Sequence, residues 1–239
     1  MISEHKFSSG YTSFWRNALP LGEAFVRLMN QRLRKFAEPY EFDAPAEKSA
    51  LLSEASFRLL IAMGDILRAP RSTEQADLLL VPKAIEDAVR YLSLLRGPKL
   101  PVERLEAAEN HIVITIARRL RQFFRNEEGS ERLVTAPRFE GCGFLDSCEG
   151  DILAGTLLYE IKNKERKFRL VDLRQVLTYC ALNYAKSTHP INGIGFVNAR
   201  SGEFFKISLT NLARKAAGCS ASELLSEIVD FVSTDQISN

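Results

Sequence analysis

Apolar residues recur at intervals of three and four through much of the first hundred positions, which is the spacing of amphipathic helices. Three segments have this spacing most clearly: 21–36, 49–67 and 82–95. Two segments between them hold proline and polar residues and are expected to be loops: 37–47 and 69–74. The segment RGPKLP, residues 96–101, is the best candidate for a boundary. We therefore predict a helical N-terminal region, residues 1–100, ahead of a second domain, residues 101–239.

Beyond Pro101 the pattern changes to helix, strands, helix, strands, helix. A long amphipathic helix is expected over 102–124, and a second helix over 172–186 with Asp172 as its N-cap. Short β-like runs lie between and after these helices: 143–148, 150–154, 156–162, 193–199 and 203–209. A final amphipathic helix is expected over 221–232. This order predicts a mixed α/β fold.

The segment GDILAGTLLYEIKNK, residues 150–164, alternates like a hairpin but carries charged residues within its apolar pattern. A turn at Ala154-Gly155 pairs Leu153 with Thr156 and places Asp151 opposite Leu158. Any turn with an even number of residues keeps Asp151 on the same face of the hairpin. A turn with an odd number places it on the other face.

With an even turn, Asp151 shares a face with Glu160 and Lys162, because side chains alternate along a strand. Asp151 and Glu160 are then diagonal neighbours, with backbones about 7 to 8 Å apart. Two carboxylates at that separation can bind one divalent ion, Mg²⁺ or Mn²⁺, and the backbone carbonyl of Ile161 offers a further ligand. Lys162 can orient a water or stabilise developing negative charge, which makes the group a hydrolytic set for phosphodiesters. The alternative interpretation is an exposed strand face with an ordinary ion pair.

The expected helix 172–186 adds Gln175 and Tyr179, which are four residues apart and so lie on one helix face. Asp151, then Glu160-Ile-Lys162 on the following strand, then Gln175 and Tyr179 on the following helix, resemble the PD-(D/E)XK nuclease superfamily and its RecB-type branch. The resemblance covers about residues 102–210. It implies a restriction-endonuclease-like core of helix, three-stranded sheet, helix and further strands, preceded by the helical region.

By this resemblance, Asp151 and Glu160 hold the metal and Lys162 assists the attacking water. Gln175 and Tyr179 contact substrate or support the metal site; the alternative for them is a packed tyrosine with a surface amide. Gly150 stands where the family pattern has proline.

These nucleases often take a further carboxylate from the first core helix. Glu109 is our first candidate because it interrupts the apolar stripe of the helix 102–124, and Glu106 is the second. The alternative for Glu109 is a partly exposed helix charge.

The chain has 32 basic and 30 acidic residues and a net charge of +2, so binding to nucleic acid must depend on local charge. The segment 162–174 is rich in basic residues and directly follows the Glu-x-Lys triplet. Phosphate contact by its side chains is one interpretation, and a solvated turn is the other. The proposed substrate contacts are Lys164, Lys167, Arg169 and Arg174.

These features predict a divalent-metal-dependent nuclease that hydrolyses DNA, with RNA not excluded, and by weak analogy a component of bacterial restriction or phage defence. The alternative is a catalytically silent nuclease fold that serves as a binding scaffold. Because no P-loop occurs, any motor must be a separate partner chain; a homodimer is a further hypothesis. No signal-type h-region and no stretch of roughly 20 apolar residues occurs, which predicts a cytoplasmic protein without a membrane span.

Overall fold

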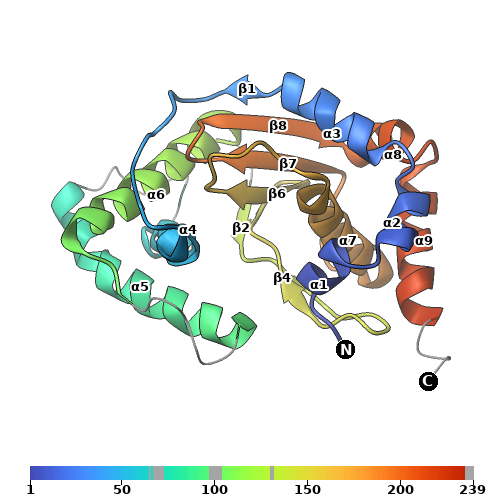
Figure 1. The fold of residues 1–239 in the computed structure, drawn as a ribbon, viewed down its shortest axis with the longest axis horizontal. Helices are drawn as coiled ribbons and strands as arrows, with labels where there is room; N and C mark the ends of the chain where they lie inside the picture. Colours follow the sequence, from blue (N-terminus) through green and yellow to red (C-terminus); the bar gives the residue numbers. More distant parts are fainter. Residues whose placement is uncertain (65, 67–72, 97–103, 130–131, 235–239) are drawn as a thin grey trace.

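The computed structural model describes residues 1–64, 66, 73–96, 104–129 and 132–234. Within them the chain forms a mixed α/β fold around a six-stranded sheet with helices on both faces (Figure 1). The strands follow the order β1-β8-β7-β6-β5-β2, and every neighbouring pair is antiparallel except the parallel pair β6 and β7. Their bounds are β1 (Arg34–Lys35), β2 (Leu133–Thr135), β5 (Ile152–Ala154), β6 (Leu157–Lys162), β7 (Gly193–Asn198) and β8 (Glu203–Ser208).

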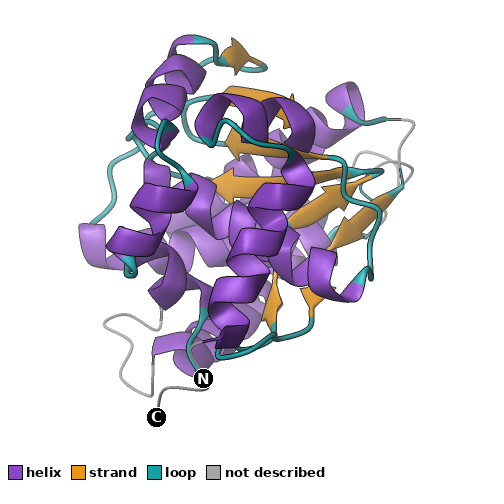
Figure 2. Ribbon diagram, turned by 90° about the vertical axis from the view of Figure 1, so that its right-hand side faces the viewer, coloured by secondary structure: helices purple, strands orange, loops and turns teal. Residues whose placement is uncertain are grey.

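The helices divide between the two faces of the sheet, because alternate strand residues point to opposite faces. Leu153 and Leu158 join one apolar cluster, and Ile152 and Tyr159 join the other. The first cluster includes α1 (Glu4–Ser9), α2 (Thr12–Ala18), α3 (Gly22–Gln31), α7 (Leu170–Lys186), α8 (Leu209–Ala216) and α9 (Ala221–Thr234), the layer that faces the viewer in Figure 2. The second includes α4 (Ser49–Ala62), α5 (Glu74–Arg96) and α6 (Ala107–Glu127).

Residues from both sides of the predicted boundary contribute to both apolar clusters. Strand β1 from the N-terminal region also pairs with β8 near the C-terminus. Most of the boundary segment 96–101 lies outside the described residues, and the division into two domains stays a prediction. Within the described residues, no helix combines the length and the apolar character that a membrane crossing requires.

Four predicted helices end or begin elsewhere: the one predicted over 49–67 is Ser49–Ala62, the one predicted over 102–124 is Ala107–Glu127, and two others differ as follows. The helix predicted over 21–36 ends at Gln31, and the chain then forms β1, whose partner strand lies about 170 residues further on. The helix predicted over 82–95 begins earlier, at Glu74, and contains Pro82. Proline removes one N–H from the helical ladder, yet the helix continues, with Val81 and Ala84 almost fully buried on either side of Pro82. Tertiary packing here outweighs the local preference for a break.

The strand predicted over 143–148 is wrong for most of its length. Only its last residue belongs to a strand, β4 (Cys148–Glu149), which pairs with β3 (Arg138–Phe139) outside the main sheet. Phe144 packs against the aromatic rings of Phe7, Tyr11 and Phe231 instead. The third antiparallel strand beside β5 is β2.

The prediction of Asp172 as an N-cap is also wrong. Helix α7 begins at Leu170 with Arg169 in the N-cap position. Asp172 lies one turn in, where its Oδ2 accepts a hydrogen bond of 2.8 Å from the backbone N–H of Arg169. The Asp172 carboxylate therefore accepts the hydrogen bond of a backbone N–H at the start of the helix, although Asp172 itself lies inside the helix.

Candidate active site

The hairpin β5–β6 has an even turn, but the turn is not the one predicted. Ala154 pairs with Leu157 and Leu153 with Leu158, so the two turn residues are Gly155 and Thr156. Gly155 adopts a positive φ of 57°, which glycine accepts without strain. Extending this register outward by two pairs places Asp151 directly opposite Glu160, where a diagonal relation was predicted.

Asp151, Glu160 and Lys162 share the face of the hairpin that looks toward α7. Leu153 and Leu158, their neighbours on that face, both belong to the apolar cluster around α7. Ile161 alternates to the other face and packs toward α4, α5 and α6. The charged residues thus lie on the same face as these two leucines and continue that row of side chains to the end of β6.

Asp151 is tied to β6 through the backbone of the neighbouring strand. Its Oδ2 accepts a hydrogen bond of 2.6 Å from the N–H of Ile161. In a strand the N–H and C=O of one residue point to the same edge, so the carbonyl of Ile161 also lies on the Asp151 side. Burial raises the pKa of Asp151, against the opposing effects of this hydrogen bond and of Lys162.

Glu160 is the most deeply buried carboxylate of the group, at 3% exposure. Its Oε1 accepts a hydrogen bond of 2.5 Å from Lys162 Nζ, whereas its Oε2 is buried and has no hydrogen-bond partner among the residues that the structure describes. Burial raises the pKa of Glu160 to about 8, with Lys162 opposing the rise and Asp151 adding to it. An unpartnered buried carboxylate oxygen is costly, and a cation beside it would remove that cost.

The ammonium of Lys162 lies between β6 and α7. Besides Glu160 it approaches Asp172 Oδ1 at 3.6 Å and donates to Gln175 Oε1 at 3.3 Å. Burial lowers the pKa of Lys162, but Glu160 and Asp172 outweigh burial and the pKa lies above its ordinary value. Lys162 is therefore a fixed cation, positioned by one residue of its own strand and two of the following helix.

Gln175 and Tyr179 lie on the same face of α7, as their spacing predicts. Gln175 Nε2 donates a hydrogen bond of 2.8 Å to the Tyr179 hydroxyl while its Oε1 accepts from Lys162. The Tyr179 ring is buried and stacks on Phe139. Burial raises the pKa of the phenol, which keeps it neutral. The two residues orient Lys162, and their contact with substrate stays a prediction.

Glu109 and Glu106, the candidates from the first core helix, cap the start of α6. Glu109 Oε2 accepts a hydrogen bond of 2.6 Å from the N–H of Glu106, and both carboxylates form ion pairs with Lys48. These contacts join Glu109 to α4 and to its own helix. They do not join it to Asp151 or Glu160.

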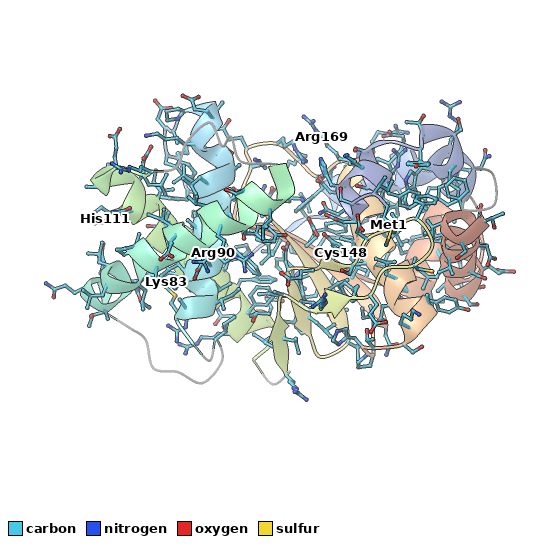
Figure 3. All side chains as sticks on the ribbon, turned by 90° about the horizontal axis from the view of Figure 1, so that it is seen from below. Met1, Lys83, Arg90, His111, Cys148 and Arg169 are labelled. Carbon is cyan, nitrogen blue, oxygen red and sulfur yellow. The ribbon has the colours of Figure 1, made fainter. Side chains whose placement is uncertain are left out.

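Several basic side chains of the segment 162–174 are engaged by the protein itself. Lys167 forms an ion pair with Glu203 at 2.8 Å, and Lys164 Nζ donates to Ser49 Oγ at 3.0 Å. The Arg174 guanidinium lies 5.9 Å from the centre of the Trp15 ring, on the side of α2. Arg169 is exposed at the surface (Figure 3). The segment is thus less strongly basic toward solvent than its sequence implies.

An ion pair that the sequence did not predict lies on the side of α4 and α5. Arg58 of α4 pairs with Glu54 at 2.7 Å and lies 4.5 Å from the centre of the Tyr91 ring of α5. Burial raises the pKa of Glu54 to about 7, with Arg58 opposing the rise and Asp151 adding to it, so Glu54 lies within electrostatic reach of Asp151. The spacing of Glu54 and Arg58 is that of any surface ion pair on a helix, which offers no sequence signal.

The residues present fit a divalent cation held by two carboxylates. Asp151 and Glu160 are paired across the hairpin, and Glu160 Oε2 is a buried acceptor that lacks a donor. In the part of the chain that the structure describes, no cluster of three or more His, Cys, Asp or Glu side chains has the geometry of a metal site. The remaining ligands would be water, substrate oxygens and the Ile161 carbonyl, as is usual for Mg²⁺.

Comparisons with protein-family models, with curated proteins and with solved structures found no match to this chain. The chemistry of the site must therefore be argued from its side chains and their contacts. The PD-(D/E)XK pattern stays a resemblance carried by five residues, Asp151, Glu160, Lys162, Gln175 and Tyr179.

Proposed function

We propose that this chain is a divalent-metal-dependent nuclease that hydrolyses phosphodiester bonds of DNA, with RNA as the alternative polymer. The observation that carries the proposal is the buried carboxylate of Glu160. One of its oxygens pairs with Lys162 and the other has no partner, beside Asp151 on the same face. An ion pair with a purely structural role would require only one carboxylate beside Lys162, whereas Asp151 and Glu160 both lie on this face.

The order of elements supports the same proposal. Helix α6 precedes the antiparallel strands β2, β5 and β6, and α7 then leads to β7, which lies parallel to β6. This is the succession expected of a restriction-endonuclease-like core, which forms part of the proposal. It places the end of β6 and the first turns of α7 side by side, where Lys162 meets Asp172 and Gln175.

Charge balance supports a bound cation. When all three carboxyls are ionised, Asp151, Glu160 and Asp172 face only two cations, Lys162 and Arg166, whose guanidinium binds both oxygens of Asp172. Without a metal, burial favours the protonated form of Glu160, and a bound cation would replace that proton. When bound, Mg²⁺ or Mn²⁺ supplies positive charge and lowers the pKa of a water molecule. Asp151 and Glu160 would hold that ion by their side-chain oxygens.

Lys162 contributes as a hydrogen-bond donor. Because its pKa is raised, it stays protonated at neutral pH and does not act as a base. It can orient the attacking water or stabilise negative charge on the phosphate oxygens, and Gln175 fixes its direction. Water then adds directly across the P–O bond, without a covalent enzyme intermediate.

Cleavage of plasmid and single-stranded DNA with Mg²⁺ or Mn²⁺ tests the proposal. We expect Asp151→Asn and Lys162→Ala each to lower the rate by about 10²-fold or more. Asp146→Asn and Lys186→Ala change the same residue types at exposed positions and should cleave like the parent. Undiminished cleavage in both site variants would refute the proposed site.

The competing function is a binding scaffold that keeps the fold without cleavage. The internal pairing of Lys167 with Glu203 and of Arg166 with Asp172 favours a scaffold for protein contacts, because these cations are partly neutralised and attract phosphates less. If the parent cleaves neither DNA nor RNA with Mg²⁺ or with Mn²⁺, the scaffold is the better account. A partner motor, a defence-system subunit and a homodimer stay predictions from the sequence.

A further inference from the structure

Two adjoining hollows lie beside the end of β6, with volumes of about 580 and 550 Å³. They share four residues, Phe42, Asp43, Glu165 and Arg200. The second is also lined by Asn163 and Lys164, which directly follow Lys162 in the chain. Arg166, which also lines the second hollow, forms an ion pair with Asp172, and Asp172 Oδ1 lies 3.6 Å from Lys162 Nζ, so this hollow is linked to the candidate active site.

We propose that these hollows form a pocket for one nucleobase of the strand that is cut. The inference rests on the proposed function, because it identifies the ligand as part of the nuclease's substrate. It goes beyond that function by assigning a base-binding role to residues outside the carboxylate and lysine group.

The pocket offers planar groups for stacking. The Arg200 guanidinium lies 4.0 Å from the centre of the Phe42 ring, and the rings of Tyr40 and Phe42 are 5.3 Å apart. Arg200 is held in place by the Phe42 carbonyl at 2.7 Å and by an ion pair with Glu165. Aromatic rings and guanidinium planes are the groups on which proteins stack unpaired bases.

Two buried polar atoms in the walls lack hydrogen-bond partners. They are Asn163 Oδ1, on a residue that is 7% exposed, and Ser201 Oγ. Asn163 lines the second hollow and Ser201 the first. Both atoms are closed to solvent as the chain stands, so the side chains would have to rotate toward the hollow for a ligand to supply the missing hydrogen bonds and remove this cost.

The charges of the pocket favour a base over a phosphate. The charged residues that line the two hollows together are four carboxylates and three cations: Glu41, Asp43, Glu47, Glu165, Lys164, Arg166 and Arg200. Arg166 and Arg200 already form ion pairs with carboxylates, so a phosphate would meet a small excess of negative charge, which does not repel a neutral base. An amide oxygen such as Asn163 Oδ1 accepts a hydrogen bond from a ring or exocyclic N–H, which each of the four bases offers, so Asn163 does not by itself select one base.

A single buried side chain keeps the pocket walls in register. Asn198 Oδ1 accepts from the N–H of Arg200 at 3.1 Å and of Lys164 at 3.3 Å, and its Nδ2 donates to the Lys164 carbonyl at 2.7 Å. The turn after β7 and the segment after β6 are thus fastened together before any ligand arrives. A preformed pocket loses less entropy on binding.

The test is binding of short single-stranded DNA in EDTA, followed by fluorescence anisotropy, with one nucleotide at a time replaced by an abasic unit. We expect one position at which the abasic unit weakens binding by about tenfold or more, the loss of one stacked base. Phe42→Ala and Ser201→Ala should bind the parent oligonucleotide more weakly and lose this position dependence. Tyr184→Ala, at an exposed tyrosine, is the matched control and should bind like the parent.

Ser201→Ala keeps the test decisive if Phe42→Ala folds poorly. Removing an unpartnered buried hydroxyl should leave the unfolding midpoint unchanged or higher, so weaker binding by this variant reports a lost ligand contact. If DNA binds but no abasic position matters, or if Ser201→Ala binds like the parent, the pocket is refuted while the nuclease proposal stands. If the parent neither binds nor cleaves nucleic acid, the proposed function fails and the pocket with it.

Discussion

At the scale of single residues, the shared face of Asp151, Glu160 and Lys162 could be predicted because side chains alternate along strands with a period of two. The individual contacts of these side chains could not be predicted in this way. Asp172 approaches Lys162, and the N–H of Ile161 binds Asp151, only after α7 has packed on the sheet and the register of the hairpin is set.

Without metal, the stability of the fold should fall as pH rises through the titration of Glu160. The unfolded carboxyl loses its proton near 4.5, whereas the folded one keeps it up to about 8. Between these values the folded state binds more protons, so the free energy of unfolding decreases as pH rises. Urea unfolding in EDTA from pH 5 to pH 8.5 measures this slope. Asp151 and Glu54, whose pKa values are also raised, add to it in the same direction.

Glu160→Gln should flatten that slope, because glutamine does not titrate. Glu54→Gln serves as the comparison and should keep the part of the slope that extends above pH 7. A parent protein whose stability rises from pH 5 to pH 8 would show that the Glu160 carboxyl is not destabilised by burial.

At the scale of elements, strong local alternation predicted β6, β7 and β8 to within two residues at each end. Two of the failures share one cause, namely partners distant in sequence. The apolar run 143–148 joins an aromatic cluster with Phe7 and Phe231, and residues after Gln31 pair with β8. Neither partner can be inferred from the segment itself.

Gly202, in the turn between β7 and β8, should tolerate no side chain. Its φ is +70°, and a Cβ there would lie 2.1 Å from the carbonyl oxygen of Ala37, whose N–H in turn faces the Gly202 carbonyl. Gly202→Ala should therefore lower the free energy of unfolding by about 2 kcal/mol or more, through both strain and displacement of the segment after β1.

Gly218→Ala is the matched control for that substitution. Gly218 has a similar φ of +77°, but nothing lies within 4 Å of its added Cβ. It should cost only the strain of a left-handed backbone, about 1 kcal/mol. Equal losses in the two variants, measured by urea unfolding, would show that the segment after β1 does not press on Gly202.

At the scale of the whole molecule, the sheet separates a layer of α4, α5 and α6 from a layer centred on α7 (Figure 1). The candidate active site lies at the end of β6, with Glu54 on one side and Gln175 on the other. The composition gives the chain little net charge. In the folded chain Arg166 and Lys167 form ion pairs with Asp172 and Glu203, so the basic segment 162–174 is partly neutralised as well. The resemblance to a nuclease family predicted Asp151, Glu160 and Lys162 as site residues. The neighbouring ion pair of Glu54 and Arg58 on α4 could be found only in the folded chain.

If Asp151 and Glu160 together hold a divalent ion, replacing either carboxylate must weaken metal binding. Calorimetric titration of the metal-free protein with Mn²⁺ measures this in the parent, Asp151→Asn and Glu160→Gln, with Glu109→Gln as the control at a buried carboxylate outside the site. We expect Mn²⁺ to bind the parent, either site substitution to weaken binding by about tenfold or more, and Glu109→Gln to leave it unchanged. Equal Mn²⁺ affinity in the parent and in both site variants would show that these two carboxylates do not hold the ion.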